Sequence, residues 1–271
     1  MNSALTYQGI TLDGATALAL LEWQAELGAD VAMRDNPLDR FDLPARVEPP
    51  AVAAPAPVAA KPTPDSDQAD LLAQAQALAA GAATLDALAD AQRSFDGIEL
   101  KKGARNFVFS DGNPAARVLI LGEAPGDAED RQGRPFVGAA GQLLDQMFAA
   151  IGLSRGSPDA ENALYIINVL TWRPPGNRDP RPDEIDLSLP FLRRHIELAT
   201  PDVIVLMGNI PCQAALNKRG ILKLRGQWDT AFGVPALPMT HPAYLLRNAA
   251  AKADAWADVL SLAARLDLPP V

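Results

Sequence analysis

Four short apolar runs recur in the second half of the chain, and each has the length of one buried β-strand. They are Val118–Leu121, Leu164–Val169, Val203–Met207 and Ala236–Met239. The first three carry no charge and are rich in leucine and β-branched residues, which is typical of parallel strands covered on both faces. The fourth contains Pro238 and follows Pro235, so it predicts an edge strand, where a missing N–H is tolerated.

Helical patterns separate these runs. Over residues 140–151, and again later in the chain, apolar side chains recur on one helix face: Leu143, Leu144, Met147, Phe148 and Ile151, then Ile185, Leu189, Leu192 and Ile196. Strands that alternate with helices favour a layered α/β fold, because each crossover helix packs back onto the sheet. We therefore predict a three-layer α/β/α sandwich around a central four-stranded, mainly parallel sheet.

The first third of the chain has a different pattern. Residues 11–29 place apolar side chains at helical spacing, so residues 1–46 are expected to form a helical extension. Residues 47–66 hold six prolines and six alanines, which is typical of a semi-rigid, extended linker. An alanine-rich helix is expected over 67–93, at the start of a domain that spans 67–271.

Composition narrows the class of protein. The 271 residues contain one cysteine, Cys212, and two histidines, His195 and His241, so a disulfide within the chain is excluded and a zinc site is not expected. No apolar stretch is long enough to cross a membrane, and no secretory signal is visible, which favours a cytoplasmic protein. His195 and Cys212 are interpreted as core residues.

The formal net charge of −9 is unevenly distributed. Residues 1–93 carry a net −8 and residues 94–271 only −1. The second part of the chain can therefore present a basic face to nucleic acid despite the acidic whole.

Polar side chains follow the predicted strands. Glu123 and Asn168 come at the ends of the first two, Asn177 follows in a proline-rich loop, and His241 follows the fourth. Ligands of open α/β sheets bind outside the carboxyl ends of the strands, so these side chains are expected to converge. No serine or cysteine nucleophile stands at these ends, which disfavours acyl transfer and favours hydrolysis by a positioned water, or simple binding.

Longer motifs surround these positions. The segments GEAPGDAEDRQGRPFVGAAGQLLDQM, NVLTWRPPGNRDPRPDEI, PDVIVLMG, LRGQW and THPAYLLRN occur in this order. In them the chain strongly resembles uracil-DNA glycosylases of family 4, over roughly Phe95 to Leu266. The resemblance implies an enzyme that flips deoxyuridine out of DNA and cuts its N-glycosidic bond with water.

The resemblance also implies roles at the base. Glu123, with the backbone of Gly122 and Ala124, would contact the base and the attacking water. Phe136 would stack on the uracil face. Asn168 would accept from uracil N3–H and donate to O4, a pattern that cytosine reverses.

Two further residues would act on the reaction itself. His241 would donate a hydrogen bond to uracil O2 as negative charge builds on the leaving base. Asn177 would position water near the sugar, and the division of that task between Asn177 and Glu123 stays open.

For DNA, the resemblance implies that Tyr244, Leu245 and Leu246 form a loop that wedges into the duplex. Arg247 would meet a phosphate. Apart from the resemblance, the three arginines of the proline-rich loop, Arg173, Arg178 and Arg181, suit a phosphate-facing rim. Uracil-containing DNA is thus the expected partner of a protein expected to be a monomer. Residues 1–46 could dock a further protein.

One departure from the family is visible. Family 4 members usually hold a [4Fe–4S] cluster on four cysteines, whose positions here are Phe95, Ile98, Trp172 and Ser188. None of these can ligate iron as a thiolate, so we expect no cofactor and no metal. The hypothesis is that a hydrophobic cluster replaces the metal centre.

Alternative functions stay open. A non-catalytic DNA or nucleotide binder on the same fold would retain the pocket but release no base. A glycosylase of broader specificity would also remove hypoxanthine or xanthine. A relative that traps DNA covalently uses a histidine in an inserted loop, which the segment after Trp172 lacks.

Overall fold

The computed structural model describes residues 5–7, 10–12 and 66–268. The chain divides into two units, Met1–Pro62 and Thr63–Val271. In the first unit, β1 (Leu5–Tyr7) and β2 (Ile10–Leu12) pair antiparallel. The helix predicted over 11–29 is therefore wrong at its first two residues, which are extended and paired. Its remainder and the predicted linker, up to residue 65, lie outside the described residues.

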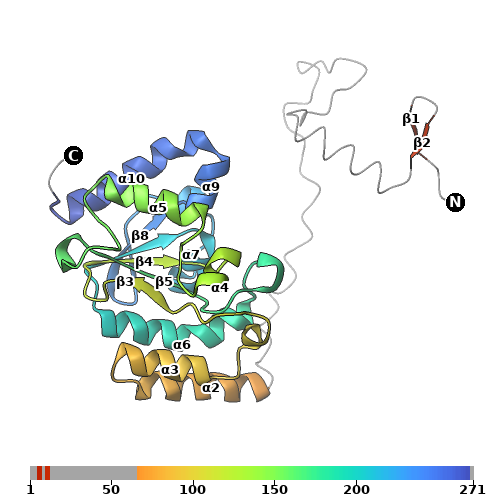
Figure 1. Cartoon of the computed structure of the whole chain (residues 1–271), viewed down its shortest axis with the longest axis vertical. Helices are drawn as coiled ribbons and strands as arrows, with labels where there is room; N and C mark the ends of the chain where they lie inside the picture. The colour runs from red at the N-terminus through yellow and green to blue at the C-terminus, as the bar shows by residue number, and fades with distance from the viewer. Residues whose placement is uncertain (1–4, 8–9, 13–65, 269–271) are drawn as a thin grey trace, which may run out of the picture. The chain divides into compact units, whose positions relative to one another are not determined.

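The second unit is built on a mixed sheet (Figure 1). Its strand order is β3-β5-β4-β6-β8-β7. The four inner strands are parallel, and the outer two run antiparallel to their neighbours. In chain order the strands are β3 (Ser110–Gly112), β4 (Val118–Gly122), β5 (Leu164–Asn168), β6 (Val203–Met207), β7 (Asp229–Ala231) and β8 (Val234–Met239).

The layered α/β architecture is thus confirmed, but the sheet has six strands rather than four. The two missed strands, with the sequences SDG and DTA, are three residues long. Such short, polar segments have no apolar run for a pattern to reveal, because only their backbones bind the sheet edge.

The expected edge strand is also misplaced, since β8 lies between β6 and β7. Pro238 stands opposite Leu206 of β6, beyond the residues that pair with β7. Its carbonyl accepts from the Gly226 N–H at 3.0 Å. Because the N–H and C=O of one strand residue point to the same side, the missing N–H of Pro238 costs no bond to β6.

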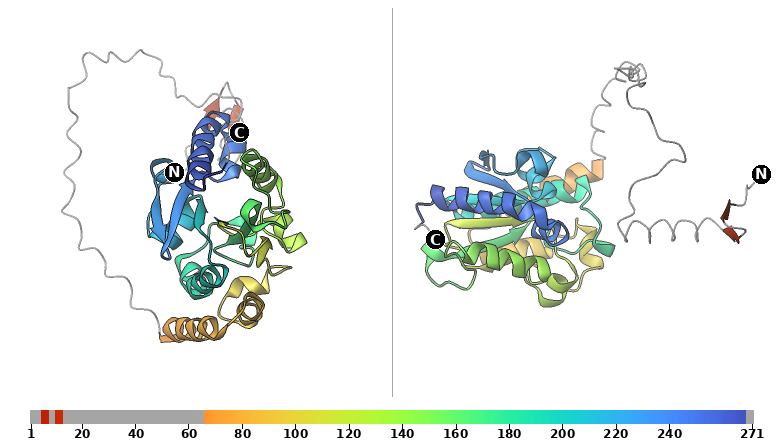
Figure 2. Two further views of the ribbon diagram at one scale, coloured as in Figure 1. Left: turned by 90° about the vertical axis from the view of Figure 1, so that its left-hand side faces the viewer. Right: turned by 90° about the horizontal axis from the view of Figure 1, so that it is seen from above.

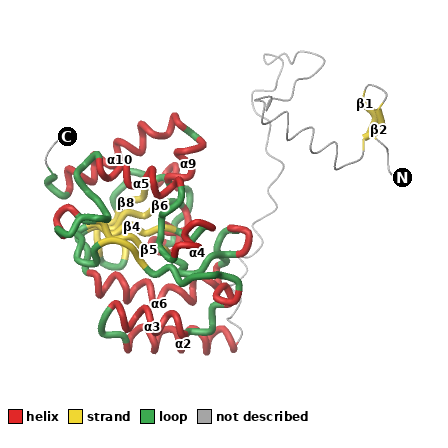
Figure 3. Tube along the Cα trace, viewed as in Figure 1, coloured by secondary structure: helices red, strands yellow, loops and turns green. Residues whose placement is uncertain are grey.

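Helices cover both faces of the sheet (Figures 2 and 3). Along β4, Leu119 and Leu121 face one core and Val118 and Ile120 the other, as the two-residue period of a strand requires. The first core is covered by α6 (Pro182–Ala199) and α7 (Asn209–Leu216), the second by α5 (Ala139–Ala149) and α10 (Lys252–Arg265).

The run predicted as one helix over 67–93 is two, α2 (Ser66–Gly81) and α3 (Leu85–Ser94). The chain leaves the helix after Gly81, and Thr84 begins the next one as the N-cap of α3, where its hydroxyl accepts from the Ala87 N–H at 3.2 Å. Both helices pack against α6, outside the sandwich (Figure 1). Their small buried residues, such as Ala75 and Ala79, join the first core.

The remaining elements are short. They are η1 (Glu99–Lys102), α4 (Asp127–Gln132), η2 (Ala160–Asn162), η3 (Pro175–Asn177), α8 (Ile221–Leu224), α9 (Pro242–Arg247) and η4 (Ala249–Ala251). Among the described residues, none of the helices has the length and apolarity needed to cross a membrane.

The register of the sheet brings the ends of its parallel strands to one level. Gly122 stands opposite Asn168, and Met207 opposite Met239, so four parallel strands end almost level. The residues that follow them in the chain therefore share one edge of the sheet, as the strand-end prediction requires.

Candidate active site

A pocket of about 880 Å³ opens at this edge. It brings together Glu123, Asn168, Asn177 and His241, as predicted from the strand ends. Other predicted residues on its wall are Ala124, Phe136, Arg178, Tyr244 and Arg247. Gly122, Arg173, Leu245 and Leu246 do not line it.

Asn168 ends β5 with its side chain only 5% exposed. Its Oδ1 is buried and has no hydrogen-bond partner in the described structure. Buried polar atoms almost always have a partner, so an acceptor left empty at a pocket is a place for a donor from a ligand.

Gly122 makes room for this arrangement. A Cβ at Gly122 would collide with Asn168 Oδ1 and with the ring of Phe136. The amide of Asn168 and the ring of Phe136 can therefore both pack against residue 122 only because it is a glycine without a Cβ. Phe136 is 7% exposed, and its ring lies 5.4 Å from the His241 ring, centroid to centroid, at an interplanar angle of 27°.

His241 caps α9, and its Nδ1 accepts from the Ala243 N–H at 3.1 Å. In the neutral ring the proton must then be on Nε2, which has no hydrogen-bond partner in the described part of the chain. Burial, helped by the Arg247 charge and opposed by that of Glu129, lowers the pKa of His241 to about 4. Near neutral pH the ring is an uncharged donor.

Glu123 follows β4, and its carboxyl has no hydrogen bond within the described residues. Burial, together with the Asp179 charge and against that of Arg219, raises the pKa of Glu123 to about 7. A carboxyl with such a pKa exchanges protons readily near neutral pH, as a general base requires.

Asn177 is exposed and lies in η3 with a positive φ of 54°. Its Oδ1 accepts from the Arg173 Nε–H at 2.8 Å, and the same guanidinium pairs with Asp127 at 2.8 Å. Arg173 thus holds the loop of Asn177 through its Oδ1, and both Nδ2 donors of Asn177 are left for a water or ligand.

The rim arginines differ in what they already bind. Arg178 forms two hydrogen bonds with the buried carboxylate of Glu184, at 2.9 Å and 2.5 Å. Arg219 and Arg247 line the pocket and form no salt bridge with any residue of the described ranges. Arg219 donates only to Gln213 Oε1, at 2.6 Å. The less engaged cations are therefore Arg219 and Arg247.

The predicted wedge needs a correction at Leu245, which is 1% exposed and belongs to the core. Successive residues of a helix point about 100° apart, so Leu245 and Leu246 of α9 cannot share one face. Leu246 is 50% exposed. The Tyr244 hydroxyl accepts from Asn248 Nδ2 at 2.8 Å.

Sequence reasoning missed three charged residues of the pocket wall, Glu129, Asp179 and Arg219, and it missed Arg155, which lies behind the wall and binds the Phe136 loop. Glu129 carried a signal, because its carboxylate accepts from the Gly126 N–H three residues earlier, the spacing of a capping box. The other three are charged residues in polar loops, which resemble an ordinary solvated surface until the chain is folded.

The four positions that the resemblance assigns to cluster ligands are buried in the structure. They are Phe95, Ile98, Trp172 and Ser188. The Phe95 ring contacts Phe191 at 5.5 Å, and the Ser188 hydroxyl donates to the Glu184 carbonyl at 2.8 Å. Over residues 5–7, 10–12 and 66–268, no three His, Cys, Asp or Glu side chains group as metal ligands.

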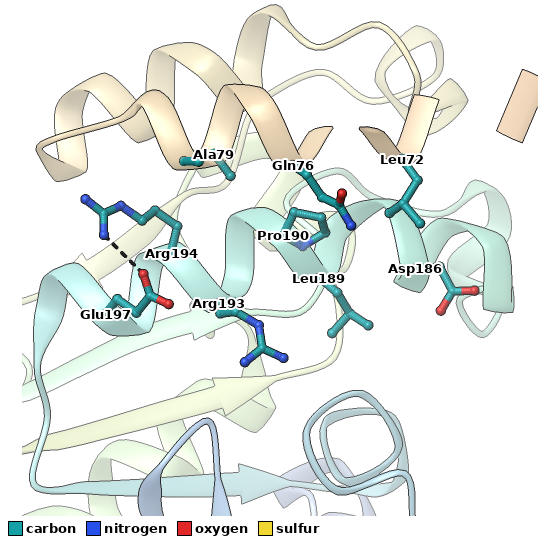
Figure 4. Close-up of a pocket in the computed structure, with 10 residues that line it drawn as sticks. Leu72, Gln76, Ala79, Asp186, Leu189, Pro190, Arg193, Arg194 and Glu197 are labelled. Atoms are coloured by element: carbon teal, nitrogen blue, oxygen red, sulfur yellow. Dashed lines mark hydrogen bonds and ion pairs between the residues drawn. The ribbon is translucent and has the colours of Figure 1, made fainter. Parts of the chain in front are cut away.

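Two other features lie away from the strand ends. A hollow of about 420 Å³ separates α2 from α6, and Arg194 pairs with Glu197 on its wall at 3.1 Å (Figure 4). His195 is buried in the core, where its Nε2 is 2.7 Å from the Tyr165 hydroxyl and its ring stacks on Phe109 at 4.4 Å.

The sequence of the chain is similar to those of known proteins. Type-4 uracil-DNA glycosylases from Sulfurisphaera tokodaii and Thermotoga maritima are each 41% identical to the chain, over 53% of it and over 67% and 73% of their own lengths. The enzyme from Saccharolobus solfataricus is 37% identical over 60% of the chain and 78% of its own length. Residues 109–260 match the family described as the uracil DNA glycosylase superfamily, and the chain belongs to that family.

Proposed function

We propose that this protein is a DNA repair hydrolase that cuts the N-glycosidic bond of deoxyuridine in DNA and releases uracil. The observation that carries the proposal is the buried, unpartnered Oδ1 of Asn168 beside the ring of Phe136. The similarity of the chain to type-4 uracil-DNA glycosylases, over more than half of its length, supports the same substrate.

The amide of Asn168 suits the edge of uracil. Oδ1 accepts from N3–H, and the Nδ2 group donates to O4. Cytosine has an acceptor at N3 and an amino donor at position 4. It would therefore place an acceptor against Oδ1 and a donor against the Nδ2 group, and neither hydrogen bond would form. An unpaired buried group costs about 1–3 kcal/mol, so two of them reject cytosine strongly.

His241 stabilises the leaving base. As the C1′–N1 bond breaks, its electron pair leaves with uracil, and negative charge develops on O2. The neutral Nε2–H of His241 donates a hydrogen bond to this oxygen. A fixed donor in a buried site is worth more than one in water, because it needs no reorganisation when the charge appears.

Glu123 acts on the water. The water oxygen forms a bond to C1′, and the ionised carboxylate of Glu123 takes its proton. Asn177 lies on the same pocket with its Nδ2 donors free, so it positions the water rather than accepting a proton from it. The proposal thus assigns the proton acceptor to Glu123 and the positioning of the water to Asn177.

The DNA surface lies around the pocket mouth. Leu246 presents an exposed apolar side chain that fills the gap left by the flipped nucleotide. Tyr244 lies on the pocket wall. Arg219 and Arg247 contact phosphates on either side. Arg173 and Arg178 already hold carboxylates, so their role is to shape the loop of Asn177.

The chemistry proceeds without an iron–sulfur cluster. The four positions that would hold one are filled by two aromatic rings, an aliphatic side chain and a hydroxyl that is already bonded. The indole N–H of Trp172 is buried without a partner, but an N–H donor is not an iron ligand. The residues present do not fit the group, and a carbon core replaces it.

The function is tested with oligonucleotides that carry uracil, cytosine, thymine or hypoxanthine at one position. The freed base is identified by chromatography, and the abasic strand is cut with alkali. We expect release of uracil alone. Release of hypoxanthine would establish the broader specificity, whereas binding without release of any base would establish the non-catalytic alternative.

The cofactor proposal has its own measurement. Protein purified without oxygen is assayed for iron and for visible absorption, and its excision rate is recorded on the same sample. We expect full activity with no iron. Stoichiometric iron with a broad charge-transfer band would contradict the proposal.

A further inference from the structure

Phe136 has a backbone conformation that a phenylalanine rarely adopts. Its φ is +52°, in the left-handed region where Cβ crowds the backbone. Such a conformation persists only where the surroundings hold it, and it is concentrated at functional sites. The ring that forms one wall of the pocket is thus set by whatever fixes the loop from Gly133 to Gly138.

Arg155 holds the carbonyl side of this loop. Its guanidinium donates from Nη1 to the Pro135 carbonyl and from Nη2 to the Phe136 carbonyl, each at 2.9 Å. Two neighbouring carbonyls bound by one planar group define the direction of the chain at Phe136, since both bonds come from a rigid fork.

Arg155 is itself fixed. Nε donates to Asp145 of α5 at 2.8 Å, and Nη1 donates to Asp111 of β3 at 3.0 Å. The side chain is 15% exposed. Four of its five N–H donors are therefore used, and the group joins the loop to the edge of the sheet and to a helix.

Glu129 holds the opposite side of the loop. Its Oε1 accepts from the N–H groups of Val137 and Gly138, each at 2.9 Å, and its Oε2 accepts from Gly126 at 3.1 Å. The positive Arg155 thus binds the two carbonyl groups of the loop, and the negative Glu129 binds the two N–H groups that follow them. The aromatic wall is organised before any base arrives.

We infer that Arg155 is a positioning residue for base binding, which holds Phe136 in its left-handed conformation so that the slot between Phe136 and Asn168 is already formed. Arg155 does not line the pocket, so it acts on the base only through the Phe136 loop. The inference rests on the proposed function for the identity of the base.

Arg117 provides a matched control. Like Arg155 it is a partly buried arginine that bridges two carboxylates, Asp202 at 2.7 Å and Glu161 at 3.0 Å, and it donates to the Leu266 carbonyl at 3.4 Å. It lies outside the pocket wall and has no bond to the Phe136 loop. A merely structural loss should thus be similar in Arg117→Ala and Arg155→Ala.

The experiment compares wild type, Arg155→Ala, Arg155→Lys and Arg117→Ala, all as full chains. For each we measure the single-turnover rate of uracil release, the inhibition constant of free uracil, and the affinity for undamaged DNA. We then add guanidinium far below denaturing concentrations, with sodium chloride at equal ionic strength as its control. Hydrogen exchange at Val137 and Gly138 reports the loop without reference to activity.

We expect Arg155→Ala to lose about a hundredfold in rate, the loss typical of a small misplacement, and to bind free uracil at least about tenfold more weakly. Its DNA affinity should stay within about twofold of wild type, since phosphate contacts supply that term. Guanidinium should restore part of the rate, and Arg155→Lys, which lacks the fork, should lie between wild type and Arg155→Ala.

Unchanged uracil affinity and unchanged exchange in Arg155→Ala would overturn the inference, as would an equal loss in Arg117→Ala. If Arg155→Ala does not fold, Arg155→Lys decides by the same two readouts. A wild type that releases no uracil would refute the proposed function instead, and faster exchange at Val137 and Gly138 in Arg155→Ala would still establish the positioning role.

Discussion

The two walls of the pocket are positioned in different ways. Asn168, Gly122 and His241 stand at or next to strand ends, so the backbone ladder of the sheet fixes them relative to one another. Phe136 stands in a loop and is fixed by two charged side chains, Arg155 and Glu129. The chemistry that needs constant geometry is carried by the sheet, and the aromatic wall depends on side-chain contacts that single substitutions can remove.

The largest effect is expected at the sheet-borne wall. His241→Ala removes the donor to the developing anion and should lower the single-turnover rate about 10²–10³-fold, with base affinity little changed. The lost cap of α9 should cost only about 1 kcal/mol of stability. His195→Leu, in the core, is the control and should lower stability without this loss in rate. A change below about threefold at His241 would remove it from the anion site.

The loop-borne wall is tested next by Gly141→Ala. A Cβ at Gly141 would collide with the backbone of Phe136, so the loop must move. We expect the rate to fall by about a hundredfold and the affinity for free uracil to fall with it, unlike in His241→Ala. The control is Gly81→Ala, where a Cβ meets no atom within 4 Å. Wild-type uracil affinity in Gly141→Ala would show that the loop does not define the slot.

A smaller effect is expected from the charges around Glu123. The wild-type rate should rise as pH rises through about 7, because the ionised carboxylate is the active form. Asp179→Asn removes a charge that raises this pKa, so the midpoint should move to lower pH, and Arg219→Gln should move it to higher pH. Asp183→Asn, paired with Arg181 outside the pocket wall, should leave the profile unchanged. Identical profiles in all variants would exclude Glu123 as the titrating base.

The smallest effect concerns DNA phosphates. Arg219→Gln should reduce the slope of log K against log salt by about one, the loss of a single phosphate contact. Lys102→Gln, with a side chain that is 80% exposed on η1, should leave the slope unaltered. A slope that falls for Arg173→Gln but not for Arg219→Gln would show that the phosphate contact is made by Arg173, as predicted from the sequence, and not by Arg219.

What could be predicted from the sequence follows the same division. Buried parallel strands appear as uncharged apolar runs, so their ends, and with them Glu123, Asn168 and His241, could be placed together. The aromatic wall was named through a family motif, but its support was not. Arg155 follows Phe136 by 19 residues, and no local pattern distinguishes an arginine that binds two carbonyls from one in solvent.

The errors have physical causes of the same kind. The edge strands β3 and β7 are held by backbone pairing alone, which leaves no apolar signal. The phosphate-facing role of Arg173 and Arg178 stays a prediction, but no local pattern reveals the carboxylate that the fold provides for each of them. Leu245 and Leu246 are adjacent in sequence, but the helix of α9 separates them into core and surface.

The central claim is that Asn168 Oδ1 accepts a hydrogen bond from the N3–H of a flipped uracil. Inhibition by free bases tests it most directly, with uracil compared against 3-methyluracil, which lacks that hydrogen and retains both carbonyl oxygens. The account predicts that uracil inhibits excision and that 3-methyluracil at the same concentration does not. Equal inhibition by the two bases would contradict it.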